Sequence, residues 1–300
     1  MHIPDGFLST PVWAAFDVCA VPCVVYASRK AQQEFEESRL PLLGVMGAFV
    51  FAAQMINFPV GAGTSGHLVG GALLAMTLGP AAASVVMTAI LAIQALIFQD
   101  GGILALGANV FNMAIAGVLA GYLPFRLWGA GKARKAAVFA GGTLSILVSA
   151  LLAIAQLLLS GVKMPGAILG ISLGLFVVSA ALEGAITLAV FQTLERIRPS
   201  SIAPAETRRV PALLGIAAVV LAVFGVLIAS GAPDGLESLA EKAGFAAQAR
   251  ALVSTPLADY EAGFLHSEWG RKAVAGLAGL AAIYAVCAGL ARYLSAQRSQ

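Results

Sequence analysis

Apolar residues along this chain gather in runs near 20 residues long, separated by short stretches rich in polar residues, glycine or proline. A helix of about 20 apolar residues crosses about 30 Å of hydrocarbon, so the pattern predicts transmembrane helices. The candidate spans lie near residues 11–27, 41–57, 67–79, 80–98, 108–124, 136–160, 167–194, 211–230 and 271–292. The third is short for a full crossing, so we expect it to be tilted, re-entrant or joined tightly to the fourth.

The composition excludes a large soluble enzyme. The 300 residues are 59% hydrophobic and only 11% charged, with a mean hydropathy of +0.89, whereas soluble domains carry about 25% charged residues. The net charge is +3, and the basic residues are not clustered on a polar domain. This argues against a nucleic-acid partner. We therefore predict an all-α polytopic membrane bundle with about seven core spans and a two-span C-terminal hairpin.

The basic residues predict how this bundle is oriented. With the N-terminus outside, thirteen of the eighteen Lys and Arg residues fall on the cytoplasmic side, as expected for segments that are not translocated. The C-terminus is then cytoplasmic. No basic region precedes the first apolar run, so we expect an uncleaved anchor that leaves Met1 at the external face.

Breaks in the apolar pattern divide the chain into two parts. Residues 1–198 form the larger membrane domain, and a polar, proline-bearing stretch over residues 199–210 forms a cytoplasmic linker. Residues 211–300 form a helical hairpin around an external loop of about 40 residues, which is longer than an ordinary connection.

The N-terminus carries a candidate metal chelator. The amine of Met1, the amide nitrogen of His2 and its imidazole Nδ1 can form two fused rings around one ion, a planar set that suits Ni(II) or Cu(II). His67 ends a glycine-rich loop on the same external face and is a candidate fourth nitrogen donor. The alternatives are a frayed, solvated terminus and a histidine that is merely hydrogen-bonded in its loop. The scarcity of acidic residues also favours nitrogen donors.

Other polar residues are candidates for the surroundings of this site or for its cavity. Asp100 is placed to orient a ligand imidazole, and Asn109 and Asn112 begin the fifth span, where they cap the helix or line a cavity. The alternative for all of these is ordinary loop and cap chemistry. The full set is Asn57, Ser65, Asp100, Asn109 and Asn112.

Some features within the spans have two interpretations each. Asp17 and Glu183 indicate either proton coupling or structural acids, and the absence of a basic partner in any span favours the second. The small residues Gly44, Ala48 and Ala52 share a helix face that either packs internally or docks a partner helix. The three cysteines are expected to be free thiols.

Four sequence segments of the membrane domain stand out, in the order Met1 to Leu8, Gln54 to Val60, Gly63 to Gly71 and Gly107 to Met113. Together they resemble the CbiM/NikM family, the substrate-binding membrane components of energy-coupling factor transporters for nickel and cobalt, over about residues 1–195. The C-terminal hairpin, with Pro233 to Glu237 and Ala240 to Phe245, is similar to the small accessory component of the same systems, which indicates a natural fusion.

The resemblance implies a transport function and a ligand set. The metal would be held by the Met1 amine, the His2 amide and imidazole, and the His67 imidazole. Ni²⁺ or Co²⁺ would be the substrate, with no organic cofactor and no enzymatic reaction. A transmembrane coupling subunit and two cytoplasmic ATPases would be the partners, in a bacterial inner membrane. Square-planar nitrogen coordination favours nickel, with cobalt close behind.

Two other functions remain open from the sequence. A membrane factor in cobalamin biosynthesis would hold a corrinoid between its loops, and needs a large cavity. An autonomous ion-coupled metal transporter would rest on Asp17 and Glu183 alone.

Overall fold

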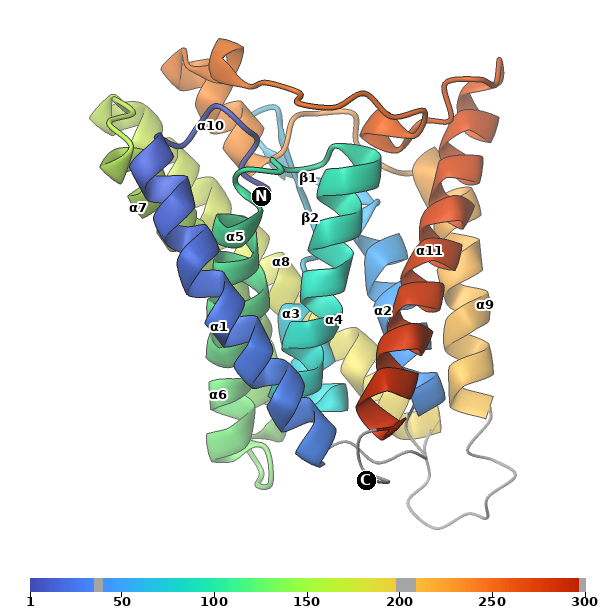
Figure 1. Ribbon diagram of the computed structural model, residues 1–300. Helices are drawn as coiled ribbons and strands as arrows, with labels where there is room; N and C mark the ends of the chain where they lie inside the picture. The colour runs from blue at the N-terminus through green and yellow to red at the C-terminus, as the bar shows by residue number, and fades with distance from the viewer. Residues whose placement is uncertain (35–39, 198–208, 297–300) are drawn as a thin grey trace.

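The computed structural model describes residues 1–34, 40–197 and 209–296. Within these ranges the chain folds as a bundle of helices whose loops gather at the two ends (Figure 1). Nearly all of the predicted linker, residues 199–208, lies outside the described ranges.

Seven helical stretches of the described residues are long and apolar enough to cross a membrane, which confirms the predicted fold class. They are α1 (Thr10–Glu34), α4 (Pro80–Ile93) with the π-helix η2 (Gln94–Phe98), α5 (Leu106–Asn109) with the π-helix η3 (Val110–Gly117) and α6 (Val118–Trp128), α7 (Arg134–Leu159), α8 (Gly166–Ile197), α9 (Arg209–Phe224) with the 3₁₀-helix η5 (Gly225–Leu227), and α11 (Glu268–Ala296).

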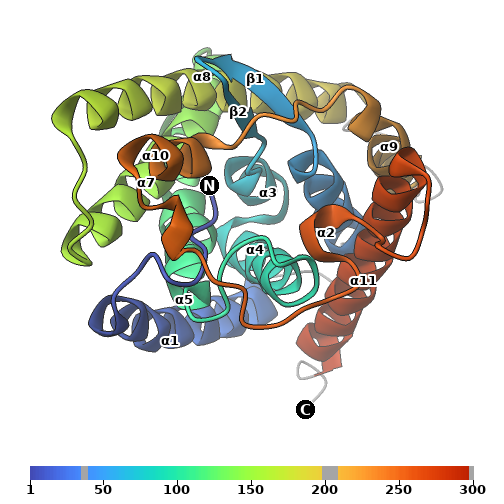
Figure 2. The ribbon, with the colours of Figure 1, turned by 90° about the horizontal axis from the view of Figure 1, so that it is seen from above.

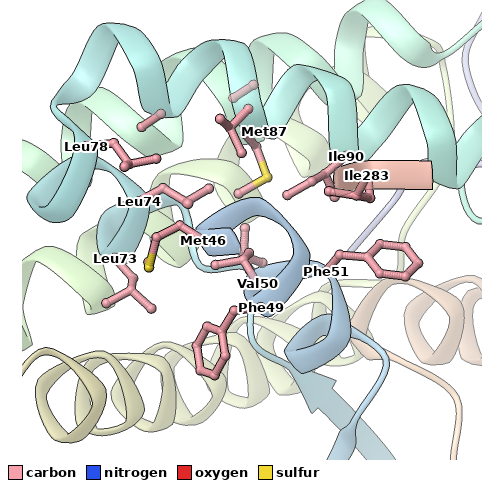
Figure 3. Packing of buried hydrophobic residues seen from close by; sticks show 14 of the residues in the cluster. Met46, Phe49, Val50, Phe51, Leu73, Leu74, Leu78, Met87, Ile90 and Ile283 are labelled. Atoms are coloured by element: carbon pink, nitrogen blue, oxygen red, sulfur yellow. The ribbon is translucent and has the colours of Figure 1, made fainter. Parts of the chain in front are cut away.

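Two predicted spans are shorter than the pattern indicated. The stretch 67–79 contains only the eight-residue helix α3 (Gly71–Leu78), and α2 runs over the 15 residues Leu40–Gln54. Eight helical residues rise about 12 Å, far less than a membrane thickness. Both helices lie inside the bundle, where Met46 and Val50 of α2 pack near Leu73 and Leu74 of α3 (Figure 3). Enclosure by protein permits irregular backbone at this depth.

An antiparallel β-hairpin connects α2 to α3. Strand β1 (Asn57–Gly61) pairs with β2 (Thr64–His67), and Asn57 is opposite His67 in the register. The turn between the strands holds Ala62 and Gly63 at positive φ, which is the left-handed region that glycine adopts easily. His67 therefore ends a strand, four residues before α3, rather than beginning a helix as the sequence pattern indicated.

The small-residue face of α2 packs inside the chain. Gly44, Ala48 and Ala52 are all buried, and a Cβ placed on Gly44 would lie 3.2 Å from the Tyr284 ring of α11. This favours internal packing against the C-terminal hairpin over docking of a separate protein.

The long loop of the C-terminal hairpin covers the end of the bundle where the N-terminus lies (Figure 2). It contains α10 (Gly235–Ala243) and two short 3₁₀-helices, η6 (Ala246–Gln248) and η7 (Ala258–Tyr260). Leu236 and Leu239 of α10 are buried in one apolar cluster with Ile3 and Phe7. The C-terminal loop and the N-terminal segment therefore pack together.

The two acids within spans both accept backbone hydrogen bonds. Asp17 accepts from the amide of Gly107 at 2.8 Å, and the buried Glu183 accepts from the amides of Val69 and Gly70 at 2.9 Å each. Each carboxylate thus joins two elements of the bundle, which supports a structural role. The three cysteines are free, as predicted.

Candidate metal site

The first five residues are fixed in the protein rather than frayed. Ile3 is fully buried, and its amide and carbonyl both bond to the Asn109 side chain, at 2.8 and 3.0 Å. The Asp5 carboxylate accepts from three successive backbone amides of residues 103–105 at 2.8–3.1 Å. The Asp5 carbonyl accepts from the amide of Arg250 at 2.8 Å. These bonds position the terminal amine inside the bundle end.

Met1 and His67 meet at this position. The terminal nitrogen lies 3.1 Å from Nε2 of His67, and it forms an ion pair with Oδ2 of Asp234, a residue of the C-terminal loop. The same carboxylate oxygen is 3.9 Å from Nε2 of His67. On its other side, Nδ1 of His67 is 3.0 Å from the carbonyl of Leu68. With Nδ1 donating to that carbonyl, the Nε2 lone pair faces the amine.

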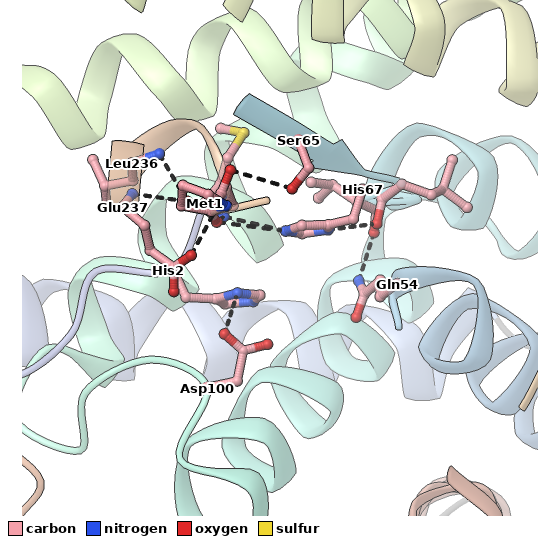
Figure 4. Close-up of polar contacts among 12 residues, drawn as sticks. Met1, His2, Gln54, Ser65, His67, Asp100, Leu236 and Glu237 are labelled. Atoms are coloured by element: carbon pink, nitrogen blue, oxygen red, sulfur yellow. Dashed lines mark hydrogen bonds and ion pairs between the residues drawn. The ribbon is translucent and has the colours of Figure 1, made fainter. Parts of the chain in front are cut away.

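His2 lies beside the same group (Figure 4). Its ring stacks parallel to the His67 ring, with centroids 5.6 Å apart, and its Nδ1 is 2.9 Å from Oδ1 of Asp100. Its Nε2 is buried without a hydrogen-bond partner. A buried polar atom of this kind normally has a partner, so the ring has unused capacity to bind a ligand.

A chain of hydrogen bonds connects Asp100, which contacts His2, to the backbone that follows His67. The Tyr260 hydroxyl donates to Asp100 at 2.5 Å and accepts from Gln94 Nε2 at 3.0 Å. Gln94 also donates to Gln54 at 2.8 Å, and Gln54 donates to the carbonyl of Val69 at 2.7 Å. Val69 is two residues after His67, so the chain connects the surroundings of the two histidines.

Electrostatics favour a neutral His67 and ionised acids around it. Burial, the nearby terminal amine and His2 lower the pKa of His67 to about 4, so its lone pair is available at neutral pH. Burial alone would raise the pKa of Asp100 and Asp234, but nearby groups outweigh it and lower both. For Asp100 these groups are His2 and the Tyr260 hydroxyl, and for Asp234 the amine and His67.

The structure brings some of the predicted surrounding residues to the site and places others elsewhere. Asp100 contacts His2, and Asn109 holds Ile3. Ser65 donates to the carbonyl of Ala232 at 2.7 Å, so it fastens the C-terminal loop to β2. Asn57 lies opposite His67 in the pairing of β1 with β2.

Neither asparagine of the fifth span caps a helix. The helical stretch begins at Leu106 without a side-chain cap, so Asn109 and Asn112 both lie inside it. Asn112 exchanges two hydrogen bonds of 2.8 Å with Gln156 within the bundle. Its amide side chain is thus paired with Gln156, and it joins η3 to α7.

Sequence reasoning missed three residues of the site: Asp5, Asp234 and Tyr260. Two carboxylates, Asp100 and Asp234, contact the candidate ligands, so the site is less poor in acids than the composition indicated. The motif around Asp234 did contain a local signal, because Asp followed three residues later by Glu is a capping box at a helix start. Its contact with Met1 has no local signal.

The possible donor set is unusual because side chains alone do not provide it. Among the described residues, no three His, Cys, Asp or Glu side chains converge on one point. The terminal amine of Met1 is a further nitrogen that lies beside the His67 imidazole. Cis ligands on a metal with bonds of about 2.0 Å lie about 2.8 Å apart, close to the 3.1 Å between Met1 N and His67 Nε2.

Comparison with known proteins finds two family matches along the chain. Residues 2–201 match the CbiM family, described as the cobalt uptake substrate-specific transmembrane region, and residues 208–296 match the PDGLE domain. The fused nickel transport protein NikMN of Rhodobacter capsulatus is 31% identical over 334 aligned positions, which cover 95% of each chain. The cobalt transport protein CbiM of Acetoanaerobium sticklandii is 37% identical over 207 positions, covering 65% of this chain and 84% of that protein.

A solved structure gives the same result for the fold. The crystal structure of a truncated transition metal transporter is 35% identical and superposes with a TM-score of 0.58, covering 66% of this chain and all of that one. The two family matches together extend over nearly the whole sequence. The chain therefore belongs to the CbiM family, and it carries a C-terminal PDGLE domain on the same polypeptide.

Proposed function

We propose that this protein binds Ni(II), or Co(II) as a close second, at its N-terminus and carries it across the membrane. The donors are the Met1 amine, the His2 amide nitrogen, Nδ1 of His2 and Nε2 of His67. The observation that carries the proposal is the distance of 3.1 Å between the terminal amine and Nε2 of His67, two residues whose side chains are largely buried. Relatives named as nickel and cobalt transport proteins support it.

The chelate geometry is consistent with this distance. In two fused rings the amide nitrogen of His2 lies between the amine and the imidazole, so the fourth ligand is opposite the amide. That ligand is therefore a cis neighbour of the amine. His67 Nε2 meets this condition, with a separation close to the about 2.8 Å expected for cis nitrogen donors.

Binding requires one local rearrangement. In the structure Nδ1 of His2 faces Asp100, whereas the chelate needs that nitrogen on the metal. Rotation of the ring about its Cβ–Cγ bond exchanges the sides that the ring nitrogens occupy. The Nε2–H group then needs an acceptor, and Asp100, held by Tyr260, is the adjacent carboxylate. A carboxylate behind a ligand histidine is a common arrangement in metal sites.

Four nitrogen donors in one plane favour nickel over cobalt. Ni(II) and Cu(II) adopt square-planar nitrogen coordination readily, whereas affinity order alone does not determine which ion a site takes in a cell. The relatives include both named nickel and named cobalt transport proteins. We infer that nickel is the preferred substrate, and a competitive titration of the two ions tests this choice.

The transport step requires other proteins. We propose that residues 1–198 form the metal-binding membrane domain, residues 199–210 a cytoplasmic linker and residues 211–300 the accessory hairpin. The domain works with a transmembrane coupling subunit and two ATPases, as an energy-coupling factor transporter of the bacterial inner membrane. ATP hydrolysis belongs to these partners, and this chain binds and releases the ion.

The proposed orientation places the metal site outside. The C-terminal ends of α1, α6 and α8 and the start of α7 lie at the end of the bundle opposite β2 (Figure 1). These helix ends carry the basic residues Arg29, Arg126, Arg196 and Arg134. Retention of basic segments in the cytoplasm then places the N-terminus and the metal site at the external face, and the C-terminal end of α11 inside. Ions would be captured from outside the cell.

The decisive experiment adds two residues before Met1. A single added residue would make the histidine third in the chain, where the amine, two amides and the imidazole form another planar nitrogen chelate. Two added residues move the amine away from the His2 amide and remove the fused chelate, while every side chain is retained. We expect the purified parent to bind one Ni(II) per chain, and the extended chain to lose at least a hundredfold in affinity. Uptake of radiolabelled nickel in cells that express the partner subunits should fall in parallel. Equal affinity and uptake in the two proteins would exclude this site.

A further inference from the structure

The carboxylate of Asp234, in the C-terminal hairpin, contacts two proposed metal ligands at once. Its Oδ2 pairs with the Met1 amine and lies 3.9 Å from Nε2 of His67. The side chain is only 15% exposed. A buried carboxylate is costly unless it is paired, so this arrangement indicates a specific role for the pair.

The second oxygen of Asp234 is fixed by the backbone. Oδ1 accepts from the amides of Leu236 and Glu237 at 2.8 and 2.9 Å. The Glu237 carboxylate in turn accepts from the amide of Asp234. This capping box begins α10. Because Oδ1 is occupied by the helix, Oδ2 is the oxygen directed at the metal site.

The backbone around Asp234 is fastened to the strand that carries His67. The Ser65 amide donates to the carbonyl of Pro233 at 2.8 Å, and the Ser65 hydroxyl donates to Ala232. Thr64 bonds to Ser238 of α10 at 2.8 Å. The distance between Asp234 and His67 is therefore set by several bonds and not by one flexible side chain.

Charge balance gives the carboxylate a function in the loaded site as well. A divalent ion with one deprotonated amide and three neutral nitrogen donors keeps one positive charge, in a buried place where charge is poorly solvated. The ligated amine still carries two N–H groups, and one of them can donate to Oδ2. Asp234 then supplies both a hydrogen-bond acceptor and a counter-charge.

We propose that Asp234 is a positioning residue of the metal site, contributed by the PDGLE domain. In the empty site it holds the Met1 amine against His67, and in the loaded site it accepts a hydrogen bond from the ligated amine and offsets the charge of the ion. This deepens the proposed function and rests on it. The accessory hairpin is thereby part of the metal site itself.

The test compares Ni(II) binding by the full-length purified chain and its variants. Asp234→Asn and Asp234→Ser both preserve a good helix cap but remove the negative charge. Loss of an outer-shell partner typically costs ten- to a hundredfold in metal affinity, and we expect a loss of that size in both variants. The visible absorption band of bound Ni(II) should stay in place, because the four nitrogen donors are retained. The matched control is Glu237→Ala, which breaks the other half of the capping box and should remain within threefold of the parent.

A second measurement separates positioning from general stability. In the metal-free protein, Asp234→Asn should lower the thermal unfolding midpoint, because it breaks the pair with the amine. In the chain extended by two residues before Met1, the same substitution should have little further effect, since the amine has already been displaced. Additive losses would show that Asp234 acts independently of the amine and would overturn the proposal.

The remaining outcomes are also decisive. Affinities of both Asp234 variants within threefold of the parent, or losses no larger than that of Glu237→Ala, would overturn the proposal. A shifted absorption band would show that Asp234 is a direct ligand and overturn the outer role given to it. Failure of the parent itself to bind Ni(II) through its N-terminus would refute the proposed function instead, so the two failures are distinguishable.

Discussion

Gly102 lies directly against Asp5, with no room between them for a side chain. A Cβ built on Gly102 would overlap the Asp5 carboxylate and lie 2.5 Å from the Asp5 amide nitrogen. The Gly102 amide also donates to the carbonyl of Ile3 at 2.8 Å. The loop after α4 therefore forms a close-fitting support for the N-terminal segment.

Substitution Gly102→Ala should displace this support and move the terminal amine. We expect a loss of at least tenfold in Ni(II) affinity, because chelation depends on donor placement within about 0.5 Å. Isothermal titration of the purified proteins measures the effect. Gly170→Ala is the control, since a Cβ there meets open space, and it should bind like the parent. Equal affinity of Gly102→Ala and Gly170→Ala would contradict the role given to this contact.

Glu183 is expected to position His67 through the backbone. It accepts from the amides of Val69 and Gly70, directly after the histidine. Glu183→Ala leaves two buried N–H groups without a partner, at a cost of about 1–3 kcal/mol each. We expect a lower unfolding midpoint and weaker Ni(II) binding, with a smaller effect for Glu183→Gln, whose amide oxygen still accepts. If Glu183→Gln instead abolished uptake while binding and stability were unchanged, proton coupling would be favoured.

The lowered pKa of His67 predicts how the stability of the folded protein depends on pH. Burial and the nearby positive groups lower its pKa to about 4 in the folded, metal-free protein, against about 6.5 in an unfolded chain. Between about pH 4 and pH 6.5, His67 therefore binds a proton in the unfolded state but stays neutral in the folded state. The stability that depends on His67 is complete above pH 6.5 and is lost as the pH falls toward 4.

Histidine-selective NMR of the metal-free protein can measure this pKa. The signal that disappears in His67→Ala should titrate with a midpoint well below 6, and by pH 5 it should still be that of the neutral ring. A midpoint near 6.5 would show that His67 is less enclosed than the structure places it. Metal binding would then face proton competition at this residue in mildly acidic solution.

The sequence predicts the membrane helices well, but not the interior of the bundle. Long apolar runs determine the spans, because only helices satisfy their own backbone in lipid. Helix α3 occupies apolar sequence that also suits a longer helix, and the β-hairpin occupies a glycine-rich segment whose pattern indicates only a loop. Local pattern therefore does not predict the form of these two elements.

The site was predicted in the same partial way. Orientation of the spans placed His2 and His67 at one end, and the structure brings them together with Met1. Asp234 is 233 residues from Met1, and Tyr260 is 160 residues from Asp100. Such contacts depend on how the C-terminal loop crosses the bundle end, and no periodicity or spacing in the sequence encodes this crossing.

The hydroxyl of Tyr260 connects this loop to the His2 side of the site and gives the last prediction. It donates to Asp100 and accepts from Gln94, so Tyr260→Phe removes the donor to Asp100 Oδ2 while the ring keeps its stacking on Phe98. Asp100 should then hold the His2 imidazole less firmly, and we expect about a tenfold loss in Ni(II) affinity, in the range of other outer-shell substitutions. Tyr26→Phe, at an exposed position of α1, is the matched control and should bind as the parent does. Because the phenyl ring still fills its place, the unfolding midpoint should change little. A large drop in stability with unchanged affinity would mean that Tyr260 holds the loop and does not support the metal ligand.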